Sequence, residues 1–214
     1  MKPKVDQWTV VLAGQWNIRI FSPGWVGREL FNDKKVQVEV GIGSGASNIR
    51  YLTQELVVIP ADTMIVIGIK RIDDEVLKKA EELASRILNI LPHTPVSGFG
   101  INFGYSIDTS ETLHKLFKLN DLDALSAKGY EVRRTEILRS LKVDNQKLNL
   151  RYTLVADGTF EAHLNFHQDI DSANGASELL RERVLDCRTR GNTLMRDVYG
   201  LEVESEEKEE SNVN

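Results

Sequence analysis

Two stretches of the chain share one pattern of apolar and polar positions. Residues 56–70 are nearly continuous apolar sequence, and residues 74–91 carry apolar side chains at helical spacing. About a hundred residues later, residues 147–167 alternate apolar and polar positions around Asp157-Gly158, and a helical pattern covers residues 172–199. Period-two alternation predicts strands and a spacing of three or four predicts helices. Each stretch is therefore predicted to be a hairpin that leads into an amphipathic helix.

The helix at residues 74–91 has the clearest boundaries. Asp73 is a natural N-cap, and Ile72 and Leu77 occupy the two positions of a hydrophobic staple. Pro92 follows the last apolar position and cannot continue a helix. In the second long helix, Gly191 stands in the middle of the apolar stripe and predicts a kink.

The remaining pattern suggests that one unit is used twice. Further strands are predicted at residues 8–13, 16–21, 36–40, 96–107 and 130–143, and shorter helices at residues 23–31 and from Ser110. Residues 1–92 and 93–200 then each read as strand, helix, three strands and long helix, and residues 201–214 as a disordered acidic tail. The predicted fold is α+β: two pseudo-repeated units forming antiparallel sheet, with the long helices packed on one face.

This element order resembles duplicated α+β domains such as the saddle of the TATA-binding protein. The resemblance lies in the order of strands and helices alone, so it implies a fold and no shared function.

Three glycines after the strand at residues 36–40 invite a phosphate-loop interpretation. Gly41, Gly43 and Gly45 would let the backbone approach a phosphate group. Such a loop requires a helix directly afterwards and, in the P-loop, a lysine. Residues 47–59 have the pattern of a loop followed by a strand, so a flexible hairpin connection is favoured.

The second hairpin has one apolar and one polar face. A loop at residues 156–158 pairs Leu154 with Phe160 and Leu148 with Phe166, which collects the apolar side chains on one face. The polar face then carries Lys147, Arg151, His163, Asn165 and His167, with Arg133 or Arg139 on the neighbouring strand. These five residues are the candidate ligand or partner site.

The first hairpin is apolar on both faces. Its isoleucines at residues 65–69 point one way, while Met64 and Val66 point the other. Strands of this kind are usually covered on both sides. Either another subunit covers Met64 and Val66, or the N-terminal segment does so with Trp8, Trp16 and Trp25, which is the favoured interpretation. Left exposed, the two residues would form an interface.

Composition and charge narrow the possible classes of function. The 214 residues carry a net charge of −5, but residues 202–214 alone contain six Glu and one Lys, so the rest of the chain is formally neutral. A neutral body argues against broad binding to phosphate backbones. The single cysteine, Cys187, excludes an internal disulfide, and no apolar run is long enough for a signal peptide or a membrane span.

No residue pattern in the chain indicates a reaction class. His163 and His167 on one strand would lie roughly 13 Å apart, too far to share one metal ion. Cys187 falls on an apolar helix stripe, as a core residue would. We therefore predict no catalytic residue, no metal site and no cofactor.

These features favour a non-enzymatic, cytoplasmic interaction protein. We expect it to self-associate as a homo-oligomer, or to bind a partner protein, through a sheet face that includes Met64 and Val66. The alternative is binding of a nucleic acid or a small anion through the polar face of the second hairpin. Nucleic acid is possible but not favoured, and no membrane association is expected.

Overall fold

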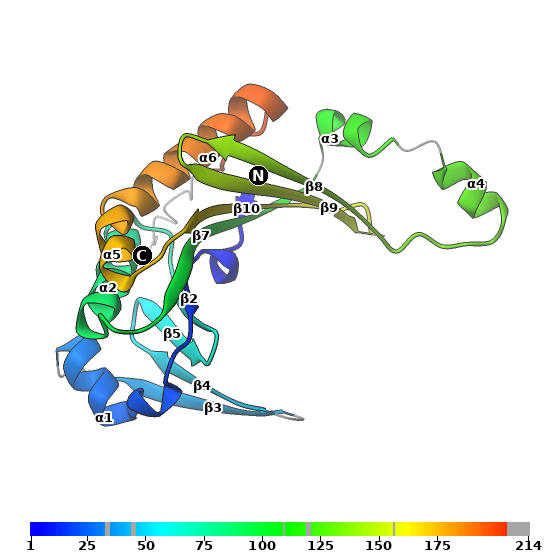
Figure 1. The fold of residues 1–214 in the computed structure, drawn as a ribbon. Helices are drawn as coiled ribbons and strands as arrows, with labels where there is room; N and C mark the ends of the chain where they lie inside the picture. The colour runs from blue at the N-terminus through cyan, green and yellow to red at the C-terminus, as the bar shows by residue number, and fades with distance from the viewer. Residues whose placement is uncertain (33–34, 44–45, 109, 119–120, 156, 205–214) are drawn as a thin grey trace, which may run out of the picture.

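The protein is an α+β structure in which helices cover one face of a single antiparallel sheet. The computed structural model describes residues 1–32, 35–43, 46–108, 110–118, 121–155 and 157–204. Ten strands of this described chain form the sheet, and helices α2 (Asp74–Ile90), α5 (Ala173–Leu180) and α6 (Arg183–Tyr199) pack against it (Figure 1). The predicted class, antiparallel sheet with long helices on one face, is confirmed.

The strand order centres on the pairing of β2 with β7. From one edge to the other the strands are β3 (Gln37–Gly43), β4 (Ala46–Leu52), β5 (Leu56–Ala61), β6 (Met64–Ile69), β2 (Thr9–Gly14), β7 (Val96–Ile107), β10 (Phe160–Asp169), β9 (Gln146–Val155) and β8 (Arg134–Val143). The short β1 (Lys2–Pro3) pairs with the far end of β7. Strands β3 to β6, which precede α2 in the sequence, therefore lie on the β2 side of the sheet. Strands β8 to β10, which follow β7 in the sequence, lie on the β7 side.

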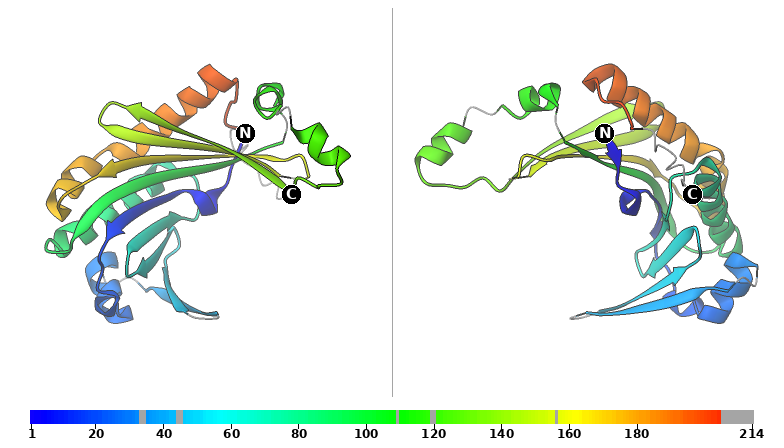
Figure 2. Two further views of the ribbon diagram at one scale, coloured as in Figure 1. Left: turned by 45° about the vertical axis from the view of Figure 1, so that its right-hand side comes forward. Right: turned by 180° about the vertical axis from the view of Figure 1, so that it is seen from behind.

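The two faces of the sheet differ in what covers them. Val10, Leu12, Ile67 and Phe103 are buried on the face that α2, α5 and α6 cover. The sheet curves so that these helices lie on its outer side (Figure 2). We call the opposite side, to which the alternate residues of each strand point, the concave face.

The register predicted for the second hairpin is confirmed. Leu154 lies opposite Phe160, and Leu148 lies opposite Phe166. Gly158 has φ +87°, the positive value that a glycine accepts without strain. The boundaries of α2 are confirmed as well, because the Asp73 side chain accepts a hydrogen bond from the Glu75 backbone N–H at 2.8 Å and the helix stops before Pro92.

The last helix is interrupted, and the prediction of one helix over residues 172–199 is wrong. α5 ends at Leu180 and α6 begins at Arg183, and between them Glu182 adopts φ +59°. The cause lies on α2: the Glu81 carboxylate accepts hydrogen bonds from the backbone N–H groups of Glu182 and Val184 at 2.7 and 2.8 Å. Glu81 therefore supplies both the acceptor and the negative charge that the N-terminus of α6 requires.

Gly191 does not break the last helix, and its close packing gives the glycine a role other than the predicted kink. α6 runs without interruption through Gly191. A Cβ atom there would lie 2.8 Å from Cδ2 of Leu164 and 3.6 Å from the ring of Phe166. Glycine at this position lets the helix approach β10 closely.

Two local predictions in the first half of the chain also need correction. Residues 16–21 do not form a strand; Ile18–Ile20 is a 3₁₀ turn (η2), and the Asn17 side chain accepts a hydrogen bond from the Arg19 N–H within it. The residues expected to be a loop after the glycines form β4, paired with β3, so a hairpin connection does follow the glycines. Ser44 and Gly45 lie outside the described residues.

The outer surfaces of the helices are charged. Arg188 of α6 pairs with Asp74 of α2 at 2.6 Å, and Arg190 pairs with Asp144 in the β8–β9 turn at 2.5 Å. Alternating acidic and basic side chains of this kind are typical of a solvent-facing helix surface. Among the described residues, no helix combines the length and the apolar character needed to cross a membrane.

Removal of the Glu81 carboxylate should weaken the start of α6. We expect Glu81→Ala to lower the free energy of unfolding by about 1–2 kcal/mol, because two helix N–H groups lose their acceptor. The matched control is Glu82→Ala, since Glu82 is the exposed neighbour on the same helix. Urea unfolding of the two variants measures the difference, and equal midpoints would contradict this role for Glu81.

Candidate functional site

The concave face contains both sets of residues that the sequence singles out. Directly paired residues on neighbouring strands point to the same side of a sheet, so a row can be followed across it. One row runs from Val66 through Val11, Gly100, His167 and Lys147. Met64 and Val66 therefore share a face with the polar residues of the second hairpin, which neither hairpin reveals by itself.

The polar residues lie opposite one another as predicted. Arg151 is paired with His163, and Lys147 with His167. The expectation for the neighbouring strand is wrong, because Arg139 points to the helix side and donates to the Tyr199 hydroxyl at 3.0 Å. Arg133 precedes β8 and forms an ion pair with Glu131. The residues of β8 on the concave face are Arg134, Glu136, Leu138, Ser140 and Lys142.

Glycines separate the polar and apolar halves of this face. Gly98 and Gly100 of β7 lie between β2 and β10, and a Cβ at Gly100 would lie 2.8 Å from Nδ2 of Asn165. Gly104 lies under the Gln7 side chain, which fills the space that a Cβ would need. The glycines thus mark close approaches, one of the possibilities that glycine within a strand suggests. At Gly98 and Gly100 the His167 ring and the Asn165 amide occupy the space that a β7 side chain would need.

A chain of side-chain hydrogen bonds crosses five strands on the polar half. Ser140 donates to Asn149 at 3.1 Å, Asn149 to Asn165 at 3.0 Å, Asn165 to Asn102 at 2.8 Å, and Asn102 to Thr9 at 3.0 Å. We call these five residues the amide ladder. Each carboxamide has two donors and an oxygen with two lone pairs, so the ladder orients the amides and leaves each with unused capacity.

The charges on the polar half are unevenly paired. Glu161 pairs with Lys4 at 2.6 Å, and Glu136 pairs with Arg134. In the part of the chain that the structure describes, Arg151, Lys142 and Lys147 have no acidic partner within ion-pair distance. Lys142 and Lys147 are also direct cross-strand partners, an arrangement that like charges disfavour. The unbalanced charge of this half is therefore positive.

His163 lies within this positive region. Its burial, together with the positive charge of Arg151, holds the pKa of His163 below its usual value. The imidazole is therefore neutral at neutral pH, and one ring nitrogen can accept a hydrogen bond.

His167 is paired with Asp169, and Nε2 lies 2.9 Å from the carboxylate. No group of three His, Cys, Asp or Glu side chains among the described residues could hold a metal ion. The histidines are thus available as hydrogen-bonding groups of the face.

The apolar half of the concave face is open. Met64 is 41% exposed, and Val66, Val11 and Ile59 beside it are half-buried. The favoured prediction, that the N-terminal tryptophans cover this side, is wrong for Trp8, which packs on Phe103 and Tyr105 of the helix-covered face. The N-terminal segment instead places the turn η1 (Val5–Gln7) over β7 at the polar half.

Beside that turn is a pocket of about 560 Å³. Gln7 and Asp6 form one wall, and Arg151 and His163 contribute to the other. Lys4 fixes the turn through its ion pair with Glu161. An anionic group of a ligand would meet Arg151 here.

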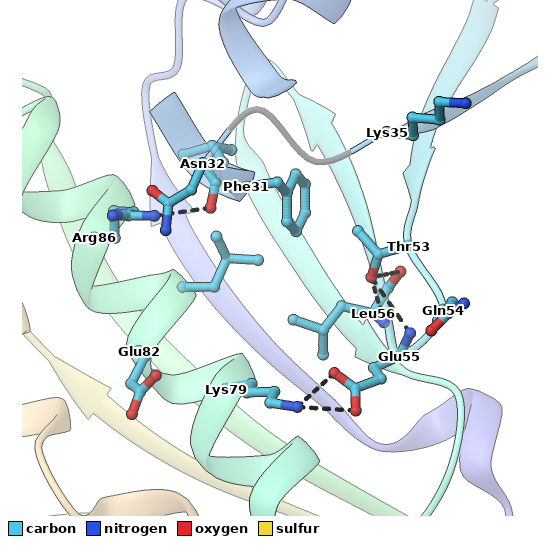
Figure 3. Close-up of a pocket in the computed structure, with 12 residues that line it drawn as sticks. Phe31, Asn32, Lys35, Thr53, Gln54, Glu55, Leu56, Lys79, Glu82 and Arg86 are labelled. Atoms are coloured by element: carbon cyan, nitrogen blue, oxygen red, sulfur yellow. Dashed lines mark hydrogen bonds and ion pairs between the residues drawn. The ribbon is translucent and has the colours of Figure 1, made fainter. Parts of the chain in front are cut away.

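A larger pocket, of about 670 Å³, lies on the helix side (Figure 3). It is lined by α2, the end of η3 (Val26–Leu30) and the β4–β5 turn. Lys79 contacts Glu55 at 2.7 Å, and Arg86 donates to the Leu30 carbonyl at 3.1 Å. Because these charged groups already have partners within the pocket, it supports a ligand site less well than the concave face does.

The nucleophile candidates have structural roles. Cys187 is fully buried, and burial raises the pKa of its thiol to about 12. Ser110 caps α3 (Glu111–Leu116) by accepting from the Leu113 N–H at 3.2 Å. Thr109 lies outside the described residues.

No protein-family model matches the sequence, and a search of curated proteins finds no significant match.

Sequence reasoning found the polar and apolar residues but missed that they form one surface. The pairing of β2 with both β6 and β7 joins them, and that pairing leaves no signal in either hairpin. The amide ladder was missed for the same reason, since its members come from five strands. Only the three glycines of β7 hinted that another group approaches closely there.

The amide ladder predicts a coupling between Gly100 and Asn165. Gly100→Ala should lower the free energy of unfolding by about 1–2 kcal/mol, because the new Cβ displaces the Asn165 amide. In an Asn165→Ala background the same change should cost less than about 0.5 kcal/mol.

A double-mutant cycle in urea measures this coupling. Gly68→Ala is the control on the same face, because its nearest neighbours would lie 3.9 Å away. Strict additivity of the two changes would contradict the ladder.

His163 should make the fold sensitive to acid. The pKa of His163 is lowered in the folded state, so the unfolded chain takes up this proton first. The stability that depends on a neutral His163 is fully present above the pKa of about 6.5 that a histidine has in the unfolded chain. It is lost as the pH falls from that value to the lower pKa of His163 in the folded state. We expect His163→Gln to lose less stability than wild type between pH 7 and pH 5 in thermal unfolding. His93→Gln, in the exposed turn after α2, should behave like wild type.

Proposed function

We propose that this chain is a non-enzymatic interaction protein that binds a second copy of itself or a partner protein through the concave face. One observation carries the proposal: a half-exposed apolar patch and three unpaired cations lie on the same helix-free face. Protein interfaces typically combine an apolar centre with a polar rim. Exposed apolar patches rimmed by polar residues mark such sites.

The physical character of the face supports a macromolecular partner. The amide ladder and the glycines of β7 give it a fixed shape, which reduces the ordering cost of binding. Around Met64 and Val66 a partner can bury apolar surface, and beyond the glycines it can place acidic groups near Lys147 and Arg151.

Binding of a nucleic acid or a small anion is a second candidate. The cross-strand Lys142–Lys147 pair and Arg151 favour it, because an anion would relieve their repulsion. Proteins that bind single strands usually stack bases on aromatic side chains. Among the described residues, no Phe, Tyr or Trp lies at the paired positions of the concave face. A protein partner is therefore better supported.

We also propose that the two halves, residues 1–92 and 93–200, arose by duplication. In support, β2 and β7 form the central antiparallel pair, each is followed by a helical segment and further strands, and each half ends in long helix. The first half has two strands more: the short β1, which pairs with β7, and β3 at the edge of the sheet.

Replacement of Met64 tests the proposed function. We expect wild-type protein to form dimers or larger species in native mass spectrometry and sedimentation, and Met64→Glu to weaken this association at least tenfold. A buried methionine contributes about 1.5–3 kcal/mol, and a buried unpaired carboxylate adds a further cost. Val198→Glu is the control, because Val198 is 59% exposed on the helix side.

Two results would count against the proposal. Association that is lost equally in Val198→Glu would contradict a role for the concave face. Salt-dependent binding of an oligonucleotide that disappears in Arg151→Glu, without any self-association, would favour the second candidate.

A further inference from the structure

One segment of the chain extends away from the rest of the molecule. Residues 118–133, which we call the arm, connect α3 to β8 and contain the short helix α4 (Leu122–Ala127). The chain is held in the core up to Phe117, whose ring centroid lies 5.6 Å from that of Phe160. Beyond it, none of the arm residues whose exposure is described (118, 121 and 124–133) is buried. Figure 1 shows α4 standing clear of the sheet and the other helices.

In the part of the arm that the structure describes, the contacts are made within the arm itself or with the end of α3. The recorded backbone hydrogen bonds of the arm are local, such as those from the Leu125 N–H to Asp121 and from the Tyr130 N–H to Leu125. Isolated helices shorter than about 12 residues are marginal in water even in favourable sequences. A six-residue helix therefore needs a surface to pack on.

The arm also exposes apolar side chains that such a surface would bury. Tyr130 is 66% exposed, Val132 is 37% exposed, and Leu125 is half-buried. Tyrosine is enriched at interfaces because it buries a large area and keeps a polar tip.

The concave face has the complementary chemistry. Its apolar half around Met64 and Val66 can receive the apolar side chains of the arm. The sequence of α4 and its preceding Asp121 contains two aspartates and no lysine or arginine, while the arm as a whole has three acidic and three basic residues. On the polar half of the face, Lys142, Lys147 and Arg151 have no acidic partner among the residues that the structure describes. The arm extends towards the side on which the concave face opens (Figure 2).

We propose that the arm of one copy binds the concave face of a second copy. This rests on the proposed function and names the binding partner. If two copies exchange arms, each contact occurs twice about a twofold axis, which closes the assembly as a dimer. The exchange gives α4 its packing surface and covers the apolar half of each face.

A complementation experiment separates this arrangement from other modes of association. The arm variant is Leu125→Lys and the face variant is Met64→Glu. A dimer made of two copies of the same variant should lose both of its arm–face contacts. Each should therefore associate at least tenfold more weakly than wild type. A mixture should form a heterodimer, because the intact arm of the face variant can bind the intact face of the arm variant. Native mass spectrometry with one isotope-labelled partner identifies this species, and thermal unfolding checks that both variants are folded.

Disulfide trapping tests the contact directly. Ser126→Cys lies on α4, and Ala61→Cys lies on the concave face opposite Met64, while the buried Cys187 does not compete. Oxidation of a mixture of the two single variants should give a covalent heterodimer. A mixture of Ser126→Cys with Val198→Cys, on the helix side, should not.

The outcomes distinguish failure of this inference from failure of the proposed function. If Met64→Glu dissociates the dimer and Leu125→Lys does not, the arm is not the partner but the face remains the interface. If neither variant affects association, both proposals fail. If the protein is monomeric and the double variant Ser126→Cys/Ala61→Cys forms only an internal disulfide, the arm covers its own face and the exchange is refuted. A monomer with no trapped species also refutes the exchange and leaves a different protein as the partner of the face.

Discussion

The backbone pairing of β2 with β7 is the constraint on which the rest of this structure depends. It joins the strands on either side of α2 in sequence into one sheet, with Val10 opposite Ile101. Because direct partners share a face, this single register decides which side chains of both halves point together. A shift by one residue would place Val10 and Leu12 on the concave side and expose the core that α2 covers.

The helices cover only one side of that sheet, and their arrangement depends on a few specific contacts. The Glu81 carboxylate of α2 accepts hydrogen bonds from two backbone N–H groups at the start of α6, and the chain turns there at Glu182. Gly191 then lets α6 approach β10 to within contact of Leu164. These contacts position the outer layer, and they leave the concave face free to act as a surface.

The concave face combines rigidity with two kinds of chemistry. The amide ladder fixes side chains across five strands, and the glycines of β7 keep the polar and apolar halves adjacent. We propose that such a surface serves recognition of a partner with both acidic and apolar groups. In the proposed exchange, the exposed apolar side chains of the arm and the aspartates at α4 would meet the apolar and positive halves of this face.

The sequence by itself determined the local elements of this protein. Alternation of apolar positions and the Asp157-Gly158 turn determined the register of the second hairpin, and Asp73 and Pro92 determined the limits of α2, because these depend on neighbours in the chain. The tertiary structure decided the strand order, the break between α5 and α6, and the union of Met64 and Val66 with the polar residues. Those features depend on contacts between residues about a hundred positions apart, such as Glu81 with Val184, and periodicity within one segment carries no information about its distant partner.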